Sequence, residues 1–255
     1  MTLAGRHALV TGASRGIGAA VAAGLAATGA RLTLLARDAT RLQALAAGLR
    51  ASGAEVQHVI ADVTDGDQVD SAFATARAAF GPLDVLINNA GAARAASFVR
   101  TDMTLWAEML EVNLTAAYRC TQAAVPDMLA RKWGRVVNVA STAGLRGDPY
   151  VSAYTAAKHG LVGLTRALAA EFAPSGITVN AVCPGYTETN LLDETLANVR
   201  RATGRSEADA RAALLAQARQ SRFVRPEEVA RAVVALCDPG SSANGEAIEI
   251  LGEGP

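Results

Sequence analysis

Cysteine and histidine are scarce in this chain of 255 residues, with three of each. The cysteines are Cys120, Cys183 and Cys237, and the histidines are His7, His58 and His159. An odd number of cysteines, far apart in the sequence, argues against a disulfide framework and against a metal cage. Because the histidines are equally scattered, we predict no metal site. So few cysteines fit a reducing cytosol.

Neither sign of charge is in excess, because 24 lysines and arginines balance 24 aspartates and glutamates. The chain therefore lacks an overall field that would attract nucleic acid or an anionic membrane. A long apolar run is also missing. The opening MTLAGRHALVTG is unlike a signal peptide, and the uncharged stretch 16–30 is too short to span a bilayer. We expect a cytoplasmic protein that binds neither nucleic acid nor membrane.

What the sequence does have is a regular alternation of short β-branched or leucine-rich runs with longer alanine-rich segments. We expect strands at His7–Thr11, Arg31–Ala36, Glu55–Ala61, Asp84–Asn88, Arg135–Ala140, Ile177–Val182 and Ala247–Leu251. We expect helices at Gly16–Thr28, Thr40–Ser52, Gln68–Phe80, Thr104–Arg131, Ala153–Phe172 and Pro226–Cys237. Such alternation predicts a parallel sheet covered on both faces. With 51% apolar residues and no linker or repeat, residues 1–255 are predicted to form one α/β domain.

One segment breaks this alternation. Between residues 186 and 225 the strand pattern disappears, and polar helical sequence with many arginines replaces it. An insertion between two core elements, near the carboxyl ends of strands, suits a small helical lid over a substrate crevice. The alternative is that this segment is an ordinary surface insertion that does not cover a substrate.

The first expected strand leads directly into TGASRGIG, residues 11–18. Gly12, Gly16 and Gly18 lack side chains where the backbone must turn and approach a ligand. The helix that follows presents free amide groups and its positive end to a phosphate. Glycines alone also serve ordinary tight turns, but strand, loop and helix in this order predict a dinucleotide site.

Six motifs occur in the order and spacing of the short-chain dehydrogenase/reductase family, which the chain resembles over about residues 5–250. They are TGASRGIG, NNAG at 88–91, Asn113, Ser141, YTAAK at 154–158 and PGYTET at 184–189. The resemblance implies a single-domain, doubly wound Rossmann fold with a seven-stranded parallel sheet and helices on both faces. Such a fold binds a nicotinamide dinucleotide at the point where the strand order reverses.

The resemblance also implies which residues contact the nucleotide. Asp62 would contact the adenine, Asn89 would lie beside the cofactor while steadying the central strands, and Thr189 would hold the nicotinamide carboxamide. The other implied cofactor-binding residues are Gly12, Ser14, Arg15, Gly16, Ile17, Gly18, Arg37, Val63, Ala90, Gly91, Tyr154, Lys158, Pro184, Gly185 and Thr187. For Asp62, a helix cap or turn residue is the alternative.

The end of the second expected strand bears on the choice of nucleotide. A free ribose 2′-hydroxyl suits a carboxylate, whereas a 2′-phosphate needs cations. The sequence reads LLARD, so Ala36 stands where NAD-using relatives carry an aspartate, and Arg37 follows. Together with Arg15 in the glycine loop, Arg37 favours NADP(H) over NAD(H). In the competing interpretation Asp38, 20 residues beyond Gly18, takes the ribose hydroxyls and Arg37 is a solvated charge.

Tyr154 and Lys158 are four positions apart in an alanine-rich helix, so the phenol and the ammonium lie on one face. The pKa of free tyrosine is about 10, and a nearby ammonium would lower it. Tyr154 is then the general acid when a ketone is reduced and the base when an alcohol is oxidised. The resemblance implies that Ser141 holds the substrate oxygen, that Lys158 also binds the nicotinamide ribose, and that Asn113 holds a water connecting Lys158 to solvent.

These assignments have alternatives nearby. A tyrosine and a lysine at this spacing also occur by chance on exposed helices. Tyr150 lies four residues before Tyr154 but has no lysine at the required offset. Thr142 could replace Ser141, although the separation of 13 positions between Ser141 and Tyr154 favours Ser141.

The expected pocket walls, segments 92–97, 143–150 and 186–192, are mostly apolar and suit an alkyl or ring ketone better than a sugar. Segment 190–225 carries seven arginines and four acids. It could attract the phosphates of coenzyme A or a carrier protein, or it could be a solvated helix face. The chain looks most like bacterial 3-oxoacyl-thioester reductases and related ketoreductases. However, Ser175 replaces the basic residue common in carrier-protein reductases, and the ending EILGEGP replaces their Asp-Gly-Gly.

Three functions follow from this reading. The first is an NADP(H)-dependent reductase of a 3-oxoacyl thioester or another apolar ketone. The second is an NAD-linked catabolic 3-hydroxyacyl or secondary-alcohol dehydrogenase, and the third is a noncatalytic dinucleotide sensor. The resemblance also implies a homotetramer built through the helices at 104–131 and 153–172.

Overall fold

The computed structural model describes residues 2–253. Seven strands in this part of the chain form one sheet in the order β3-β2-β1-β4-β5-β6-β7, and every neighbouring pair is parallel. The strands are β1 His7–Thr11, β2 Arg31–Ala36, β3 Val56–Ile60, β4 Val85–Asn88, β5 Gly134–Val139, β6 Ile177–Pro184 and β7 Ala247–Ile250. The predicted seven-stranded, doubly wound sheet is therefore confirmed.

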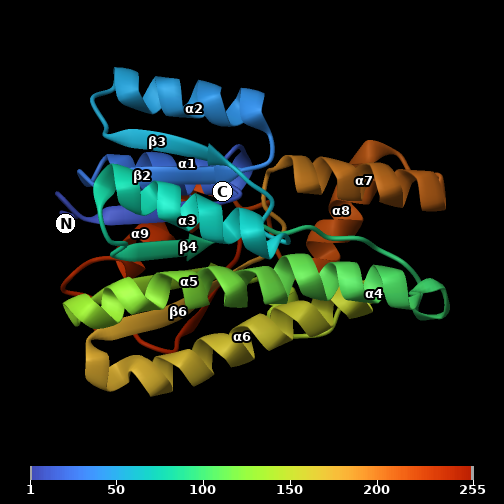
Figure 1. The fold of residues 1–255 in the computed structure, drawn as a ribbon. Coiled ribbons are helices and arrows are strands. Elements are labelled where there is room, and N and C mark those ends of the chain that lie inside the picture. Colours follow the sequence, from blue (N-terminus) through green and yellow to red (C-terminus); the bar gives the residue numbers. More distant parts are fainter. Residues whose placement is uncertain (1, 254–255) are drawn as a thin grey trace.

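Helices cover both faces of the sheet (Figure 1). One face packs against α1 (Gly16–Ala26), α2 (Ala39–Ala51) and α9 (Pro226–Leu236) through an apolar core that includes Leu25 and Val233. The other face packs against α3 (Gly66–Phe80), α5 (Ala116–Arg131) and α6 (Ser152–Phe172) around Phe73. Continuous burial of β1, β4 and β5 explains why their central residues are mainly apolar. No helix within residues 2–253 is long and apolar enough to cross a membrane.

The strand order reverses between β1 and β4. The chain winds outward from β1 to β3 on one side and then from β4 to β7 on the other. Ligands of such sheets bind outside the carboxyl ends of the strands at this reversal. The glycine loop follows β1 and NNAG ends β4, so both motifs meet there.

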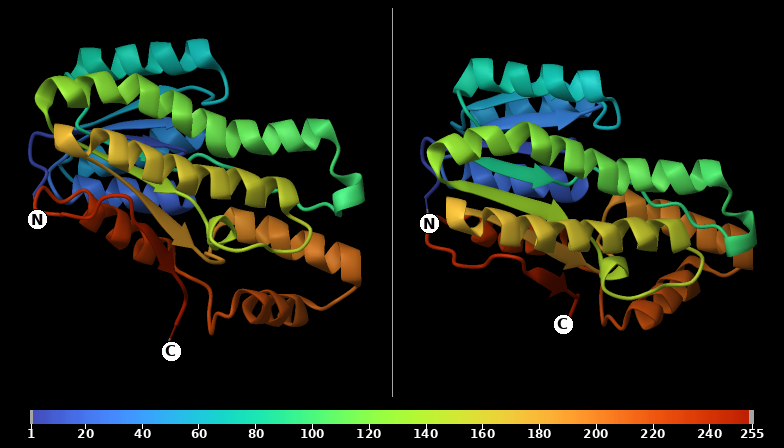
Figure 2. Two further views of the ribbon diagram at one scale, coloured as in Figure 1. Left: turned by 90° about the horizontal axis from the view of Figure 1, so that it is seen from below. Right: turned by 60° about the horizontal axis from the view of Figure 1, so that its bottom comes forward.

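The prediction of a single regular helix at Thr104–Arg131 is wrong. The structure has α4 (Met103–Leu110), a π-helical turn at Glu111–Thr115, and then α5. The apolar periodicity is continuous across the turn, which is why the sequence suggests one helix. Together α4 and α5 lie alongside α6 (Figure 2).

Segment 186–225 folds mainly as α7 (Asn190–Thr203) and α8 (Glu207–Ala218), beyond the carboxyl ends of the strands (Figure 1). The two helices share a small apolar core with Phe223. Gln220, which is buried, accepts a hydrogen bond from the Tyr186 amide at 2.9 Å and so ties the end of the segment to its beginning.

Candidate active site

The glycine loop lies directly against the end of β4. Gly12 has φ +64°, and a Cβ added there would stand 2.8 Å from the Ala90 Cα. A Cβ added at Gly18 would collide with the Gly12 carbonyl oxygen and stand 2.5 Å from the Asn89 amide nitrogen Nδ2. Both positions therefore need glycine for close backbone approach.

The amino-terminal end of α1 is open toward a ligand. Arg15 precedes the helix in extended conformation, no side chain caps it, and its first turn has no acidic residue. Gly16 has φ +55°, and a Cβ there would meet Thr189 Cγ2 at 3.1 Å, so segment 184–189 faces the loop. Ser14 is half-buried, and Ile17 packs on the core below. Free amides and a positive helix end without a competing carboxylate fit the pyrophosphate of a dinucleotide.

Thr11, the last residue of β1, joins the loop to β4. Its hydroxyl accepts hydrogen bonds from the backbone amides of Asn89 and Ala90, both at 3.0 Å. Asn89 Nδ2 in turn donates to the carbonyls of Thr11 and Gly12 at 2.9 and 3.1 Å. Asn89 thus links the two strands at the reversal point. The sequence reading quoted Thr11 within its motif but missed this role.

Ser141, Tyr154 and Lys158 come together at the carboxyl end of β5. Ser141 follows the strand, and its hydroxyl accepts from the Ala143 amide at 3.1 Å, which caps a short 3₁₀ turn. Lys158 is buried and donates from Nζ to the Val139 carbonyl at 2.9 Å. The same Nζ lies 5.6 Å from the centre of the Tyr154 ring. The helical spacing therefore brings phenol and ammonium to one site.

Asn113 lies in the π-helical turn and is almost fully buried. Its Nδ2 donates to the carbonyls of Ala92 and Met109 at 2.9 and 3.0 Å, and its Oδ1 accepts from the Ala92 amide at 3.3 Å. A Cβ added at Gly91 would stand 2.8 Å from Asn113 Oδ1 and 3.7 Å from Lys158 Nζ. Gly91 thus leaves open the space between the amide and the ammonium.

The pKa of Tyr154 differs from the value expected for a tyrosine beside Lys158. Burial raises the pKa of Tyr154, and only the hydrogen-bonding side chain of Ser141 opposes that rise. Burial likewise lowers the pKa of Lys158 to about 8. The expected lowering of the Tyr154 pKa by Lys158 is wrong for the protein alone. Burial has the largest effect on the pKa of both groups, and the ammonium donates its hydrogen bond to the Val139 carbonyl.

The residues expected to select the nucleotide lie at the ends of β2 and β3. Arg37 is largely exposed and meets Asp62 at 3.3 Å. Burial acts to raise the pKa of Asp62, but hydrogen bonds from Thr64 and the charge of Arg37 outweigh it and lower the pKa. Asp38 is engaged as the cap of α2, where it accepts from the Arg41 amide at 3.0 Å. Val63, next to Asp62, is buried in the core.

Segment 184–189 leads from the sheet into α7. Pro184 ends β6, and a Cβ added at Gly185 would stand 2.5 Å from Gln220 Oε1. Thr187 donates to the Gly185 carbonyl at 3.0 Å, and Thr189 donates to the Thr187 carbonyl at 3.3 Å. No pattern in the sequence points to Gln220, because the backbone of Tyr186, to which it bonds, lies 34 positions away.

We expect Gly18→Ala to lower the unfolding free energy by about 1–3 kcal/mol, because the added methyl has no room. Dinucleotide binding should weaken about tenfold, since the amides facing the phosphates move with it. Denaturant titration and NADPH fluorescence titration measure the two effects. Gly48→Ala is the matched control: in α2 its Cβ meets nothing, so stability should rise by up to about 1 kcal/mol. An unchanged Gly18→Ala protein would contradict the close approach.

Known proteins resemble the whole chain. The family described as short chain dehydrogenase matches residues 6–200. A protein assigned as ketoacyl reductase 1 of the granaticin polyketide synthase of Streptomyces violaceoruber is 38% identical over 248 residues, 96% of this chain and 91% of the relative. The 3-oxoacyl-acyl-carrier-protein reductase of Escherichia coli strain K12 is 36% identical over 253 residues, 99% of this chain and 98% of the relative.

Among solved structures, a variant of the actinorhodin polyketide ketoreductase with NADPH has a TM-score of 0.92 at 36% identity, covering 97% of this chain and 96% of that one. The match thus extends through the sheet, the glycine loop and segment 186–225 alike. Since the family match spans residues 6–200 and these relatives cover nearly the whole sequence, the chain belongs to the short-chain dehydrogenase family.

Proposed function

We propose that the protein is an NADP(H)-dependent reductase that converts a ketone to a secondary alcohol, with 3-oxoacyl thioesters as its preferred substrates. The observation that carries this proposal is the meeting of Tyr154, Lys158 and Ser141 beside the glycine loop at the carboxyl edge of the sheet. The relatives named as ketoacyl and 3-oxoacyl reductases, similar over nearly their whole length, support the substrate class.

The chain offers a suitable place for the nucleotide. Gly12, Gly16 and Gly18, with the open start of α1, would hold the pyrophosphate, and Thr189 and Lys158 would hold the nicotinamide end. The reduced nicotinamide supplies a hydride when bound. The protein supplies the proton and the geometry. Ser141 positions the substrate oxygen next to the Tyr154 hydroxyl, in the way that oxyanion-hole donors position and polarise a carbonyl.

Tyr154 is the proton donor of the reduction. Burial raises its pKa, so at neutral pH the phenol carries a proton that it can donate to the carbonyl oxygen. Lys158 and Asn113 lie behind it, separated only by the space that Gly91 leaves open. A water in that space would return a proton toward Tyr154 after each turnover.

Arg37 and Arg15 support NADP(H). Neither is held tightly: Arg15 is exposed, and Arg37 has only the 3.3 Å contact to Asp62. Asp38, the residue of the competing interpretation, is engaged in capping α2. We expect Arg37→Ala to raise the dissociation constant of NADPH about tenfold and to leave that of NADH within twofold, because only NADPH carries the 2′-phosphate.

Fluorescence titration of both nucleotides measures this difference. Arg231→Ala is the matched control, since Arg231 is an exposed arginine of α9 and belongs neither to the glycine loop nor to the segment after β2. Tighter binding of NADH than of NADPH by the unaltered protein would favour the NAD-linked dehydrogenase instead.

The reaction itself is tested by mixing the protein, NADPH and the N-acetylcysteamine thioester of 3-oxobutanoate and following NADPH absorbance. Turnover supports the reductase. Activity confined to NAD and secondary alcohols would support the NAD-linked catabolic dehydrogenase. Absence of any turnover would support the noncatalytic dinucleotide sensor.

The assembly and the lid remain part of this proposal. Tyr118 and Leu129 are large apolar side chains of α5 that are exposed in the single chain, which supports association through α4–α5 and α6. We propose a cytoplasmic homotetramer, in which residues 186–225 form a lid over the substrate within the single domain 1–255. Light scattering in solution measures the number of subunits.

A further inference from the structure

Arg146 lies in the loop that follows Ser141, and its side chain reaches two other parts of the fold. One guanidinium nitrogen donates to the carboxylate of Glu249 in β7, and another donates to the Ala218 carbonyl at 3.3 Å. Ala218 is the last residue of α8, in the lid segment, residues 186–225. The side chains of the ion pair are 35% and 36% exposed. The reaction described above gives Arg146 no role.

The end of α8 is a favourable place for a cation. The last carbonyls of a helix have no partners within it and form its negative end. The last turn of α8 contains no basic residue. Arg219 ends the helix in the left-handed conformation, with φ +57°, and in the described part of the chain its side chain makes no hydrogen bond to these carbonyls. Arg146 therefore supplies, from another segment, the cation at this end.

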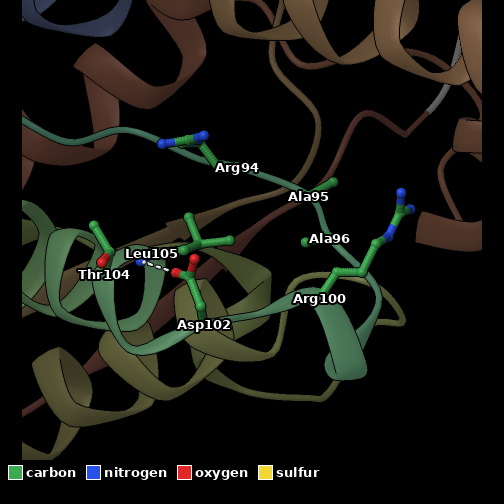
Figure 3. Close-up of a pocket in the computed structure, with 7 residues that line it drawn as sticks. All are labelled: Arg94, Ala95, Ala96, Arg100, Asp102, Thr104 and Leu105. Carbon is green, nitrogen blue, oxygen red and sulfur yellow. Dashed lines mark hydrogen bonds between the residues drawn. The ribbon is translucent and has the colours of Figure 1, made fainter.

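The hydrogen bond from Arg146 to Ala218 is the only one that joins loop 142–151 to the lid segment in the described part of the chain. A second contact joins loop 142–151 to the loop after β4, where the Ala96 amide donates to the Tyr150 carbonyl at 2.8 Å. Figure 3 shows Ala96 on that loop, beside a cavity of about 330 Å³. Loop 142–151 is thus held by its neighbour through the backbone, and to the lid segment through one side chain.

The end of the lid segment is also bound to its own beginning and to the chain after β7. Gln220 accepts a hydrogen bond from the Tyr186 amide at 2.9 Å. The carbonyl of Gly252 accepts from the amides of Ser221 and Arg222 at 3.0 and 3.3 Å. By contrast, α7 and α8 pack mainly around a small apolar core of their own. The lid segment is therefore positioned where its end meets the rest of the protein.

We propose that Arg146 is a positioning residue for the substrate pocket. By binding Glu249 and the end of α8 together, it fixes the lid segment against the loop after Ser141 and so sets the width of the pocket between them. The proposal rests on the proposed function, which supplies the substrate. Because Arg146 makes no hydrogen bond to Tyr154 or Lys158, its loss loosens the contacts of the lid with the substrate and leaves proton transfer intact.

Steady-state kinetics with NADPH and the N-acetylcysteamine thioester of 3-oxobutanoate test this role. Arg146→Met keeps an unbranched side chain and removes both hydrogen bonds. We expect KM to rise about fivefold and kcat to stay within about twofold, since a partly exposed, charge-assisted contact has about this value. Arg146→Lys keeps the charge but lacks the planar fork that reaches two acceptors, so KM should rise only about twofold.

Arg77→Met is the matched control. Arg77 also joins a carboxylate to a carbonyl, those of Asp127 and Ala123, and its side chain is 35% exposed as well. It does so between α3 and α5, which form neither wall of the pocket. KM of this variant should stay within about twofold of the unaltered protein. An unchanged KM in Arg146→Met, a fall in kcat without a rise in KM, or an equal rise in Arg77→Met would overturn the proposal.

Hydrogen exchange separates this proposal from the proposed function, because it needs no turnover. In saturating NADP⁺, the amides of residues 190–218 should exchange about fivefold faster in Arg146→Met than in the unaltered protein. Their exchange in Arg77→Met should be unchanged. Faster exchange in Arg146→Met alone supports the positioning role even if no ketone is reduced. Equal exchange in Arg146→Met and the unaltered protein overturns it, even if the thioester is turned over.

Discussion

Replacing Tyr154 by phenylalanine should lower kcat about a thousandfold while leaving the dissociation constant of NADPH within twofold. Positioned proton transfer is worth about 10² to 10⁴ in rate, and the Tyr154 phenol lies beside both Ser141 and Lys158. The phenylalanine ring keeps the packing, so the fold and the nucleotide site should persist. Stopped-flow reduction and fluorescence titration measure the two quantities.

Tyr150→Phe is the matched control. Tyr150 lies four residues earlier and is 68% exposed. Its backbone carbonyl accepts a hydrogen bond from the Ala96 amide, and phenylalanine retains that carbonyl. Its kcat should stay within about twofold of the unaltered protein. If Tyr154→Phe retained its turnover, or if Tyr150→Phe lost it, the assignment of the general acid would be wrong.

Lys158→Met should reduce turnover at least about a hundredfold and yet stabilise the protein without nucleotide. The ammonium is buried and has only the Val139 carbonyl as a partner. Methionine fills similar volume without a charge to desolvate. At neutral pH the unfolding free energy should therefore rise. The rise should be up to about 3 kcal/mol, which corresponds to the lowering of the Lys158 pKa by burial.

The stability gained by Lys158→Met should depend on pH in a direction set by the lowered pKa of Lys158. Burial lowers the pKa of Lys158 to about 8, so between that pH and its ordinary pKa of about 10.4 the unfolded chain binds a proton that the folded protein has released. In this range the contribution of Lys158 to stability rises with pH. The advantage of Lys158→Met should be greatest below about pH 8 and shrink toward pH 10. Urea titrations of both proteins measure it, and a constant difference would contradict the lowered pKa.

The sheet was predictable because its inner strands are buried on both faces and are bounded by loops. The ranges for β1 and β2 agree with the structure at both ends, and the others differ by one or two residues. Short, mainly apolar runs that alternate with helices are typical of parallel strands buried between two helical layers. The region 104–131 was harder. The buried positions 109, 113, 116, 117 and 120 follow one another at spacings of one, three or four across the π-helical turn, as they would in a single regular helix. The sequence therefore does not reveal that the amides of this turn reach carbonyls five positions back.

The candidate site was predictable in its residues but not in its contacts. Motif spacing identifies Tyr154, Lys158, Ser141 and Asn113, and helical periodicity brings two of them to one face. The partner of Lys158, the Val139 carbonyl, comes from a strand 19 positions away, and no local pattern indicates it.

The π-helical turn at 111–115 decides where Asn113 points. A π turn closes its hydrogen bonds over five residues instead of four, so it holds one residue more than a regular helical turn. Deleting one residue from this turn would let the segment return to a regular helix that joins α4 to α5. The loop after β4, which Asn113 holds through the amide and the carbonyl of Ala92, would then lose this anchor.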